Sequence, residues 1–243
     1  MNNDIKQQIA DYKPSRTAVE SLQSKRLVIF AGITSAGKNT IMNELIKTGE
    51  YYDLVTATTR PPRVNDGVME VEGVDYHFLS TEEALEHINN GDYLEVAAVH
   101  ERINGLLASE LVRAGSEHQT PVIDVDVQGV DTFKNLSDNV IAVFVVPPSY
   151  QEWVRRMKKR YPTEQEFNEA WPVRRRSAIM ELKMALSKPY YHFIVNENIP
   201  EAVQSALAIS TKPLDEFNQI DRSYHVWAQR ILHELEADSD SPA

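Results

Sequence analysis

The chain has 243 residues, and its hydrophobic content of 42% is enough to bury the core of one elaborated domain. Its 36 acidic residues against 25 basic ones give a net charge of −11, which argues against a surface that binds nucleic acid or an anionic membrane. There is no cysteine, so disulfides, thiolate metal sites and cysteine nucleophiles are excluded. No hydrophobic signal region begins the sequence and no apolar run approaches the roughly 20 residues that span a bilayer, so we expect a cytoplasmic protein.

A glycine-rich segment near the N-terminus carries the clearest chemical signal. The apolar run 27–31 ends at Gly32, and the loop that follows reads G-I-T-S-A-G-K-N-T. Strand, glycine-rich loop and helix together are typical of a P-loop, whose backbone N–H groups and helix N-terminus surround a phosphate chain. Asn39 stands after the lysine, where Ser or Thr usually contacts magnesium, and Thr40 follows one residue late. The residues expected to contact the nucleotide are Gly32, Ser35, Ala36, Gly37, Lys38, Asn39 and Thr40.

The rest of the chain alternates between predicted strands and helices. A short helix and a tether are expected over 1–24. Further strands are predicted over 51–59, 75–79, 93–99, 121–127, 139–146 and 192–195. Helices are predicted over 40–47, 81–90 and 106–114, from Tyr150 onward, after Pro172 to about 188, and over 214–235. This alternation favours an α/β fold with a parallel sheet, and the apolar stripe of the last helix indicates core packing or a subunit interface.

Two groups of arginines suit phosphoryl transfer, which requires positive charge around donor and acceptor phosphates. Arg60 and Arg63 lie three positions apart on a proline-stiffened turn and can hold an acceptor phosphate, with the Tyr76 hydroxyl as a further donor. The basic segments 155–160 and 174–176 are either a solvated helix face or a mobile lid, and a lid explains the clustering better. Asp124 and Asp126 end an apolar strand, which suits carboxylates that face magnesium or a ligand.

Several motifs together resemble the guanylate kinase family of nucleoside monophosphate kinases. They follow the family's order over about 26–207: the P-loop at 32–40, TTRPPR at 58–63, GVDYHF at 73–78, YLE at 93–95, DVDVQG at 124–129, PPS at 147–149 and IVNE at 194–197. The resemblance implies a three-layer P-loop kinase with a parallel core sheet, an inserted GMP-binding subdomain and a lid. The implied boundaries are an N-terminal helical extension over 1–24, the kinase domain over 25–211 with its insertion at about 55–106 and its lid at about 155–177, and a C-terminal helical extension over 212–243.

The same resemblance implies roles for individual residues. ATP would be held by the P-loop and Asn196, and the catalytic residues would be Lys38, Arg160 and Arg175. GMP would be bound by Thr56, Arg60, Arg63, Tyr76, Glu95, Asp124 and Asp126. Glu95 would accept hydrogen bonds from guanine N1 and N2, and adenine offers no such adjacent pair of donors. Magnesium would accompany ATP, with Asn39, Thr40 and Asp124 as its candidate ligands.

The chain departs from the family pattern at positions that matter for the acceptor. Where the family has G-N-x-Y-G-[ST], this chain has E-R-I-N-G-L, so Asn104 replaces a phosphate-binding tyrosine and Leu106 replaces a hydroxyl that contacts the guanine carbonyl oxygen. The lid is longer than usual, so Arg174 or Arg176 could take the role assigned to Arg175.

The expected reaction is direct in-line transfer of the ATP γ-phosphoryl group to GMP or dGMP, giving ADP and GDP without a covalent intermediate. Asn104 and Leu106 leave open a kinase of the same fold that acts on another nucleoside monophosphate. A guanylate-kinase-like module that binds a protein without catalysis is a further alternative, but the intact P-loop argues against it. The expected partners are therefore ATP and GMP or dGMP, with no nucleic acid and no membrane, and the protein would be a monomer or a homodimer.

Overall fold

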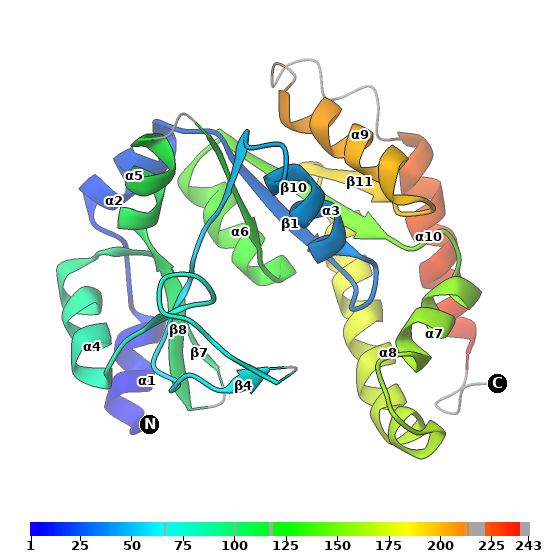
Figure 1. Cartoon of the computed structure of the whole chain (residues 1–243), viewed down its shortest axis with the longest axis horizontal. Helices are drawn as coiled ribbons and strands as arrows, with labels where there is room; N and C mark the ends of the chain where they lie inside the picture. The colour runs from blue at the N-terminus through cyan, green and yellow to red at the C-terminus, as the bar shows by residue number, and fades with distance from the viewer. Residues whose placement is uncertain (66, 100, 117–118, 212, 214–221, 239–243) are drawn as a thin grey trace. The chain divides into compact units, whose positions relative to one another are not determined.

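The computed structural model describes residues 1–65, 67–99, 101–116, 119–211, 213 and 222–238 (Figure 1). The chain divides into two compact units. The first unit comprises Met1–Leu27, Glu50–Ile123 and Asp131–Val140, and the second comprises Val28–Gly49, Asp124–Val130 and Ile141–Ala243.

Helices and strands alternate along most of the chain. The α-helices are α1 (Asn3–Ala10), α2 (Arg16–Gln23), α3 (Lys38–Ile46), α4 (Thr81–Asn90), α5 (Ala108–Ser116), α6 (Val127–Leu136), α7 (Tyr150–Lys158), α8 (Glu164–Ser187), α9 (Ile199–Thr211) and α10 (Arg222–Ala237). The strands are β1 (Leu27–Gly32), β2 (Tyr51–Asp53), β3 (Ala57–Thr58), β4 (Val64–Asn65), β5 (Val68–Met69), β6 (His77–Phe78), β7 (Tyr93–Val99), β8 (Arg102–Leu107), β9 (Thr120–Asp124), β10 (Val140–Val146) and β11 (Tyr191–Val195).

A five-stranded sheet in the order β11-β10-β1-β9-β2 forms the core. β10 pairs in parallel with β11, and β2 pairs in parallel with β9. Every residue of β10 is buried and nearly all are β-branched or aromatic, as expected for a strand covered on both faces. Because parallel neighbours need a crossover, this strand order requires the intervening helices. The predicted α/β fold with a parallel core sheet is confirmed.

The first unit also contains a separate mixed sheet in the order β6-β3-β8-β7. β3 runs parallel to β6 and antiparallel to β8, which pairs with β7 as a hairpin. Helices α1 and α4 contribute Ile9, Ala84 and Ile88 to one apolar cluster with Ala57, Tyr93, Ile103 and Leu107. The Tyr12 hydroxyl donates to the backbone oxygen of Tyr93 at 2.6 Å. The N-terminal segment is therefore part of this unit's core.

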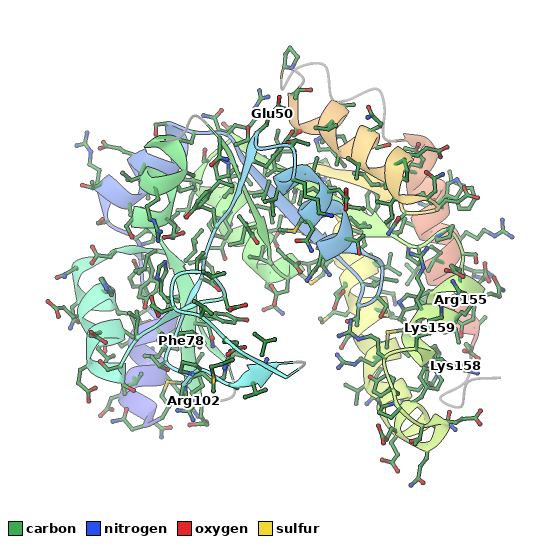
Figure 2. All side chains as sticks on the ribbon, viewed as in Figure 1. Glu50, Phe78, Arg102, Arg155, Lys158 and Lys159 are labelled. Carbon is green, nitrogen blue, oxygen red and sulfur yellow. The ribbon has the colours of Figure 1, made fainter. Side chains whose placement is uncertain are left out.

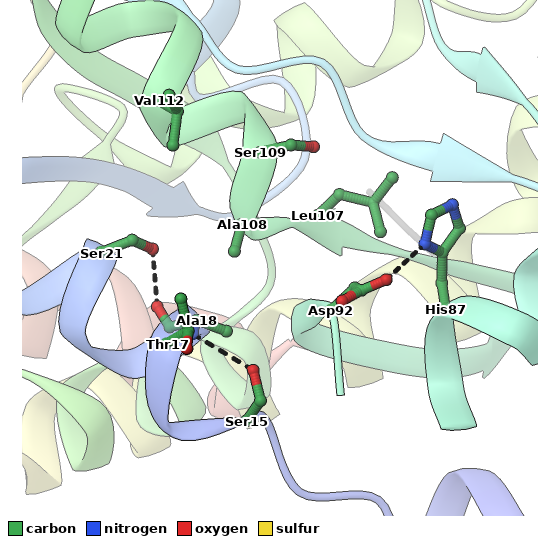
Figure 3. A pocket seen from close by; sticks show the side chains of 10 residues that line it. All are labelled: Ser15, Thr17, Ala18, Ser21, His87, Asp92, Leu107, Ala108, Ser109 and Val112. Carbon is green, nitrogen blue, oxygen red and sulfur yellow. Dashed lines mark hydrogen bonds and ion pairs between the residues drawn. The ribbon is translucent and has the colours of Figure 1, made fainter. Parts of the chain in front are cut away.

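A second N-terminal helix, α2, packs on α5, where the sequence predicted only a tether. A cavity of about 340 Å³ lies there, and it includes the hydrogen-bonded pair His87 and Asp92 (Figure 3). Ser15 begins α2 by accepting from the backbone N–H of Ala18. This serine cap explains why a helix starts there.

The second unit contains α7, α8 and α10, which pack on one another. The predicted helix after Pro172 in fact begins at Glu164, where the Thr163 hydroxyl accepts from the backbone N–H of Glu166. The helix continues through Pro172, so proline does not stop it. Of the predicted tail helix, residues 214–221 lie outside the described part of the chain, and α10 accounts for the rest.

Two further boundaries differ from the sequence-based expectation. Leu106 and Leu107 belong to β8 and not to the following helix, because they pair with β7 across the hairpin. The expected strand over 51–59 is two strands: Leu54 donates its N–H to Val122 in the core sheet, whereas Thr56 accepts from His77 in the mixed sheet. Among the described helices, none is long and apolar enough to cross a membrane.

Candidate active site

The glycine-rich loop after β1 has a shape that only glycine permits at two positions. Gly32 has φ 143°, and an added Cβ would lie 2.3 Å from the backbone oxygen of Val145. Gly37 has φ 97° at the N-terminus of α3, and an added Cβ would lie 2.1 Å from Nδ2 of Asn196. Both positions favour glycine sterically and conformationally, so the loop can approach a ligand through its backbone.

A pocket of about 390 Å³ lies over this loop. It is lined by Thr34, Ser35, Gly37, Lys38, Asn39, Thr40, Asp124 and Arg160. The Lys38 ammonium donates to the Gly32 backbone oxygen at 2.8 Å and lies 3.8 Å from Oδ1 of Asp124. Partial burial raises the pKa of Asp124, the nearby lysine lowers it, and Asp126 adds to the rise. The structure thus brings Lys38, Asp124 and Arg160 together.

Asn196 supports the loop from β11. Its side chain is buried, with 2% of the residue exposed, and its Nδ2 donates to the Ala36 backbone oxygen at 2.8 Å. Its Oδ1 has no hydrogen-bond partner among the described residues. A buried acceptor of this kind is usually satisfied by a water molecule or by a ligand group.

Two residues of α7 were missed by the sequence analysis although they hold the loop. Trp153 donates its ring N–H to the Thr34 backbone oxygen at 2.7 Å. The Arg156 guanidinium donates to the backbone oxygen of Asn196 at 3.0 Å and more weakly to that of Ala36. Their sequence neighbourhood indicated only a basic helix, because nothing local shows which backbone oxygens such side chains reach.

The predicted lid arginines have different surroundings. Arg160 lines the pocket of Lys38, whereas the Arg175 guanidinium donates to the backbone oxygens of Leu235 at 2.8 Å and Asp238 at 2.6 Å. Those carbonyls end α10, so Arg175 caps that helix. Arg174 donates to the Tyr161 hydroxyl at 3.1 Å. Other basic side chains, Arg155, Lys158 and Lys159, are exposed at the C-terminal end of α7 (Figure 2).

Glu181 of α8 was also missed. Burial raises its pKa to about 7, Asp124 and Asp126 add to the rise, and Lys38 and Arg174 oppose it. Lys38 and Arg174 both act on this carboxyl, so each lies within electrostatic reach of it. Its position in the middle of a helix has no sequence signature.

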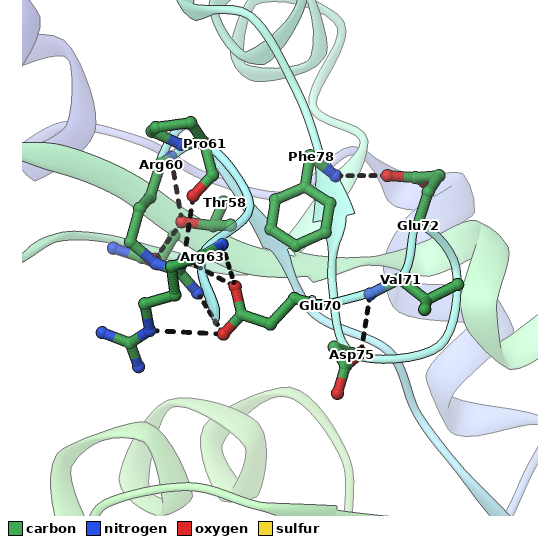
Figure 4. A network of polar contacts seen from close by, with 10 residues as sticks. Thr58, Arg60, Pro61, Arg63, Glu70, Val71, Glu72, Asp75 and Phe78 are labelled. Carbon is green, nitrogen blue, oxygen red and sulfur yellow. Dashed lines mark hydrogen bonds and ion pairs between the residues drawn. The ribbon is translucent and has the colours of Figure 1, made fainter. Parts of the chain in front are cut away.

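In the first unit, Glu70 forms ion pairs with both Arg60 and Arg63, the arginines predicted to hold the acceptor phosphate (Figure 4). Arg60 donates to both carboxylate oxygens, at 2.7 and 3.0 Å, and Arg63 donates through its backbone N–H at 3.0 Å and its Nε at 3.3 Å. The Arg60 guanidinium also lies over the Tyr76 ring at 5.1 Å. The Glu70 side chain is 4% exposed, and its bond from Arg60 holds the pKa of this carboxyl below its ordinary value. Arg60, Arg63 and Tyr76 therefore form one cluster.

Glu95 lies beside an irregularity in the β7–β8 hairpin. Tyr93 pairs with Leu107 and Glu95 with Leu106, so one residue is extra on β7. Such a bulge rotates the following side chain and is frequent next to active sites. Gly105 is required opposite, because an added Cβ would lie 2.4 Å from the backbone oxygen of Glu95.

The two departures from the family pattern also lie in this sheet. Asn104 accepts a hydrogen bond from the Thr58 hydroxyl at 2.8 Å through its Oδ1, and the Arg60 backbone N–H donates to that hydroxyl at 3.3 Å. Leu106 is buried. Thr56 is half-buried and accepts from the N–H of His77 at 2.9 Å through its backbone oxygen. Asn104 thus supports the turn that carries Arg60.

Comparison with known proteins identifies the family. The family model for guanylate kinase matches residues 24–210. The guanylate kinase of Clostridium perfringens (strain SM101) is 35% identical over 184 residues, which cover 75% of this chain and 81% of that protein. The guanylate kinase of Clostridioides difficile (strain 630) is 31% identical over 211 residues, covering 86% of this chain and 97% of that protein.

The fold has a counterpart among solved structures as well. The crystal structure of guanylate kinase from Anaplasma phagocytophilum superposes with a TM-score of 0.56 at 23% identity, covering 83% of this chain and 93% of that chain. At this identity the superposition supports the fold alone. The match to the family model and the relatives above 30% identity confirm the resemblance seen in the motifs. The chain therefore belongs to the guanylate kinase family and is an enzyme of that family.

Proposed function

We propose that this enzyme transfers the γ-phosphoryl group of ATP to GMP or dGMP, giving ADP and GDP. The observation that carries the proposal is the pocket in which the P-loop, Lys38, Asp124 and Arg160 meet. A pocket of this composition matches the donor half of a phosphoryl-transfer site, with backbone donors, a lysine and a lid arginine around one anion.

On the donor side, we assign Lys38 and the P-loop N–H groups to the phosphates of ATP. Lys38 already has an acceptor in the Gly32 backbone oxygen, so its side chain is held in place over the loop. Asn196 would accept a hydrogen bond from the nucleotide through its buried Oδ1. No protein base is assigned, because an acceptor phosphate is already anionic and direct in-line attack needs only orientation and charge.

For the lid, we assign Arg160 and Arg174 to the transferred group. Arg160 lines the pocket, and Arg174, which donates to the Tyr161 hydroxyl, is near enough to Glu181 of α8 to lower the pKa of that carboxyl. Arg175 was the lid arginine predicted from the sequence, but its guanidinium donates to backbone oxygens at the end of α10. Because the lid is longer than in the family, the sequence allowed Arg174 in place of Arg175 as the lid arginine. The hydrogen bonds of Arg175 to α10 favour Arg174.

Magnesium would bind together with ATP. Asn39, Thr40 and Asp124 all line the pocket of Lys38, and their amide, hydroxyl and carboxylate oxygens suit this ion. Within the described residues, no cluster of three or more His, Cys, Asp or Glu side chains could hold a metal. Magnesium in phosphoryl-transfer sites is usually bound through one or two side chains, substrate phosphates and water. When bound, magnesium neutralises charge on the β- and γ-phosphates.

On the acceptor side, we assign Arg60, Arg63 and Tyr76 to the phosphate of GMP and Glu95 to guanine, with Thr56 as a further contact. The shared bonds to Glu70 support a preformed pair of arginines. The bulge before Glu95 supports a carboxylate aimed at a ligand. Asn104 and Leu106 favour one alternative, a different monophosphate acceptor. Both stand where the family has a hydroxyl group; Asn104 is engaged with Thr58, and Leu106 is buried.

The test is an ADP-release assay with ATP and magnesium across GMP, dGMP, IMP, AMP, CMP and UMP. We expect GMP and dGMP to be the best acceptors. Glu95→Gln should raise KM for GMP by about 10- to 100-fold while KM for ATP stays within about twofold, since a carboxylate that accepts two hydrogen bonds is replaced by a group that can accept only through one oxygen. Preference for another monophosphate, or an equal rise of both KM values in this variant, would overturn the acceptor assignment.

A further inference from the structure

A buried glutamate outside the assigned substrate contacts joins several segments of the first unit. Glu110 lies in the first turn of α5, and its side chain is 2% exposed. It accepts from the Val55 backbone N–H at 3.1 Å and from the Arg113 guanidinium at 2.9 Å, and its Oε1 lies 2.9 Å from Nε2 of His77. Val55 precedes Thr56 and His77 follows Tyr76. Glu110 therefore connects the segments that carry two proposed GMP contacts.

His77 continues this connection to a second carboxylate. Its Nδ1 lies 2.9 Å from Oε1 of Glu72, and the other oxygen of Glu72 accepts from the Phe78 backbone N–H at 2.7 Å. Gly73 donates its N–H to the backbone oxygen of Tyr76 at 2.9 Å. Glu72 thus closes the turn 72–78 around Tyr76, and His77 attaches that turn to α5.

The contacts of His77 with Glu72 and Glu110 restrict the protonation state of its ring. An ionised carboxylate only accepts hydrogen bonds, and a neutral imidazole has one donor and one acceptor nitrogen. Burial tends to raise the pKa of Glu72, but the Phe78 N–H and His77 hold it below its ordinary value. A neutral ring between two carboxylates would direct a lone pair at one of them. Only the imidazolium donates to both.

Among the described residues, two carboxylates contact the ring. Glu72 faces it from the turn, and Glu110 faces it from α5. The Arg113 guanidinium donates at 2.9 Å to Oε1 of Glu110, the same oxygen that faces the ring, and the Tyr52 hydroxyl contacts Oε2 at 3.4 Å. The ring itself is 18% exposed, so protons reach it from solvent. Deprotonation of the ring would turn one attractive contact into a repulsive one.

We propose that His77 is a positioning residue for the acceptor site and that, as an imidazolium, it holds the Tyr76 turn against α5. The inference rests on the proposed assignment of Tyr76 to the acceptor phosphate. When the ring loses a proton, the turn loosens and the stacking of Arg60 on Tyr76 is disturbed. GMP binding therefore weakens as pH rises. ATP binding does not change, because the contacts of His77 all lie in the first unit and the P-loop lies in the second.

The variant Glu72→Gln tests the protonation requirement directly. A glutamine amide can donate to the acceptor nitrogen of a neutral ring while its oxygen still accepts from Phe78. The hydrogen bonds of His77 to residue 72 and to Glu110 can then form without the imidazolium. KM for GMP and for ATP would be measured from pH 6 to 9 in the wild type, Glu72→Gln and His77→Gln. We expect the wild-type KM for GMP, divided by that of Glu72→Gln, to rise about 3- to 10-fold over this range, the size of one hydrogen bond.

The ratio removes the titration of GMP itself, which is common to all three proteins. His77→Gln should have a raised KM for GMP at every pH, and KM for ATP should stay unchanged throughout. A flat ratio between wild type and Glu72→Gln would overturn the proposal. So would a rise in KM for ATP equal to that for GMP.

A measurement without substrate separates this proposal from the assignment of Tyr76. The NMR signals of the His77 ring, assigned by their loss in His77→Gln, would be followed with pH in the ligand-free protein. We expect the ring to change from imidazolium to neutral together with shifts of the amides of the turn 72–78. A ring that is already neutral at pH 6 would overturn the proposal, and a ring that titrates while KM for GMP stays constant would overturn the role assigned to Tyr76 as well.

Discussion

The P-loop of the second unit and the arginine cluster of the first unit, the two proposed phosphate sites, are held in shape by different means. The P-loop is shaped by backbone geometry, because Cβ atoms at Gly32 or Gly37 would collide with β10 or Asn196. The arginine cluster consists of flexible side chains that Glu70 holds through four hydrogen bonds to Arg60 and Arg63. The first kind of site has its shape from the backbone alone, whereas the arginines would have to exchange some of their bonds to Glu70 for bonds to a phosphate.

The carboxylates of the two regions differ accordingly. In the second unit, burial raises the pKa of Asp124 and Glu181 despite the nearby lysine. In the first unit, hydrogen bonds lower the pKa of Glu70 and Glu72. Negative charge is therefore disfavoured around the P-loop, where ATP brings its own, and retained around the arginines, where it fixes their orientation. The predictions that follow test this contrast.

Lys38→Ala should produce the largest effect, a loss of about 10³-fold or more in kcat, because the charge over the P-loop is removed in a partly enclosed pocket. Steady-state kinetics with ATP and GMP measures it, and circular dichroism checks the fold. Lys47→Ala is the matched control, since Lys47 is an exposed lysine at the other end of α3. Near-wild-type turnover of Lys38→Ala would refute the donor assignment.

The pair Arg174→Gln and Arg175→Gln separates the two lid candidates. We expect Arg174→Gln to lower kcat by about 10²-fold with little change in thermal stability, because it loses charge near the transferred group. Arg175→Gln should lower kcat by less than about threefold but lower the free energy of unfolding by about 1–3 kcal/mol, since it loses bonds to the end of α10. The reverse pattern would restore Arg175 as the lid arginine.

Glu70→Gln should raise KM for GMP by about tenfold and leave KM for ATP unchanged. Glutamine cannot accept both bonds from Arg60, so the arginines lose their fixed orientation. Kinetics with each substrate varied in turn measures the effect, and Glu82→Gln, an exposed change in the first turn of α4, is the control. A fall in KM for GMP would instead show that Glu70 competes with the phosphate.

Glu181→Gln should have the smallest effect, on the pH dependence of stability. The pKa of Glu181 in the folded protein, about 7, lies above its ordinary value, so the folded state holds a proton that the unfolded state has lost at neutral pH. The free energy of unfolding should therefore fall as pH rises from about 5 to 8, by on the order of 1 kcal/mol. Denaturant titrations at several pH values should show a smaller fall in Glu181→Gln, and identical slopes in both proteins would contradict the prediction.

Local motifs account for most of what could be predicted. The P-loop, the turn with Arg60 and Arg63, and the alternation of strands with helices are written in neighbouring residues, and the parallel α/β core was predicted from them. Helix starts were predictable where a cap is local, as at Ser80 with Glu83, which form a capping box at α4. Hydrophobic spacing could not show that Leu106 and Leu107 belong to a strand, because that depends on their pairing with β7.

By itself, the sequence determined the chemistry of this protein: a glycine-lined phosphate loop with its lysine, an arginine pair and the family to which they belong. Tertiary structure decided which charges are available to that chemistry. Arg175 donates to the end of α10, sixty residues away. Glu70 and Glu110 each accept hydrogen bonds from more than one residue in other segments of the chain. The physical reason is that backbone shape follows from adjacent residues, whereas the partner of a long charged side chain is chosen by packing between segments far apart in the chain.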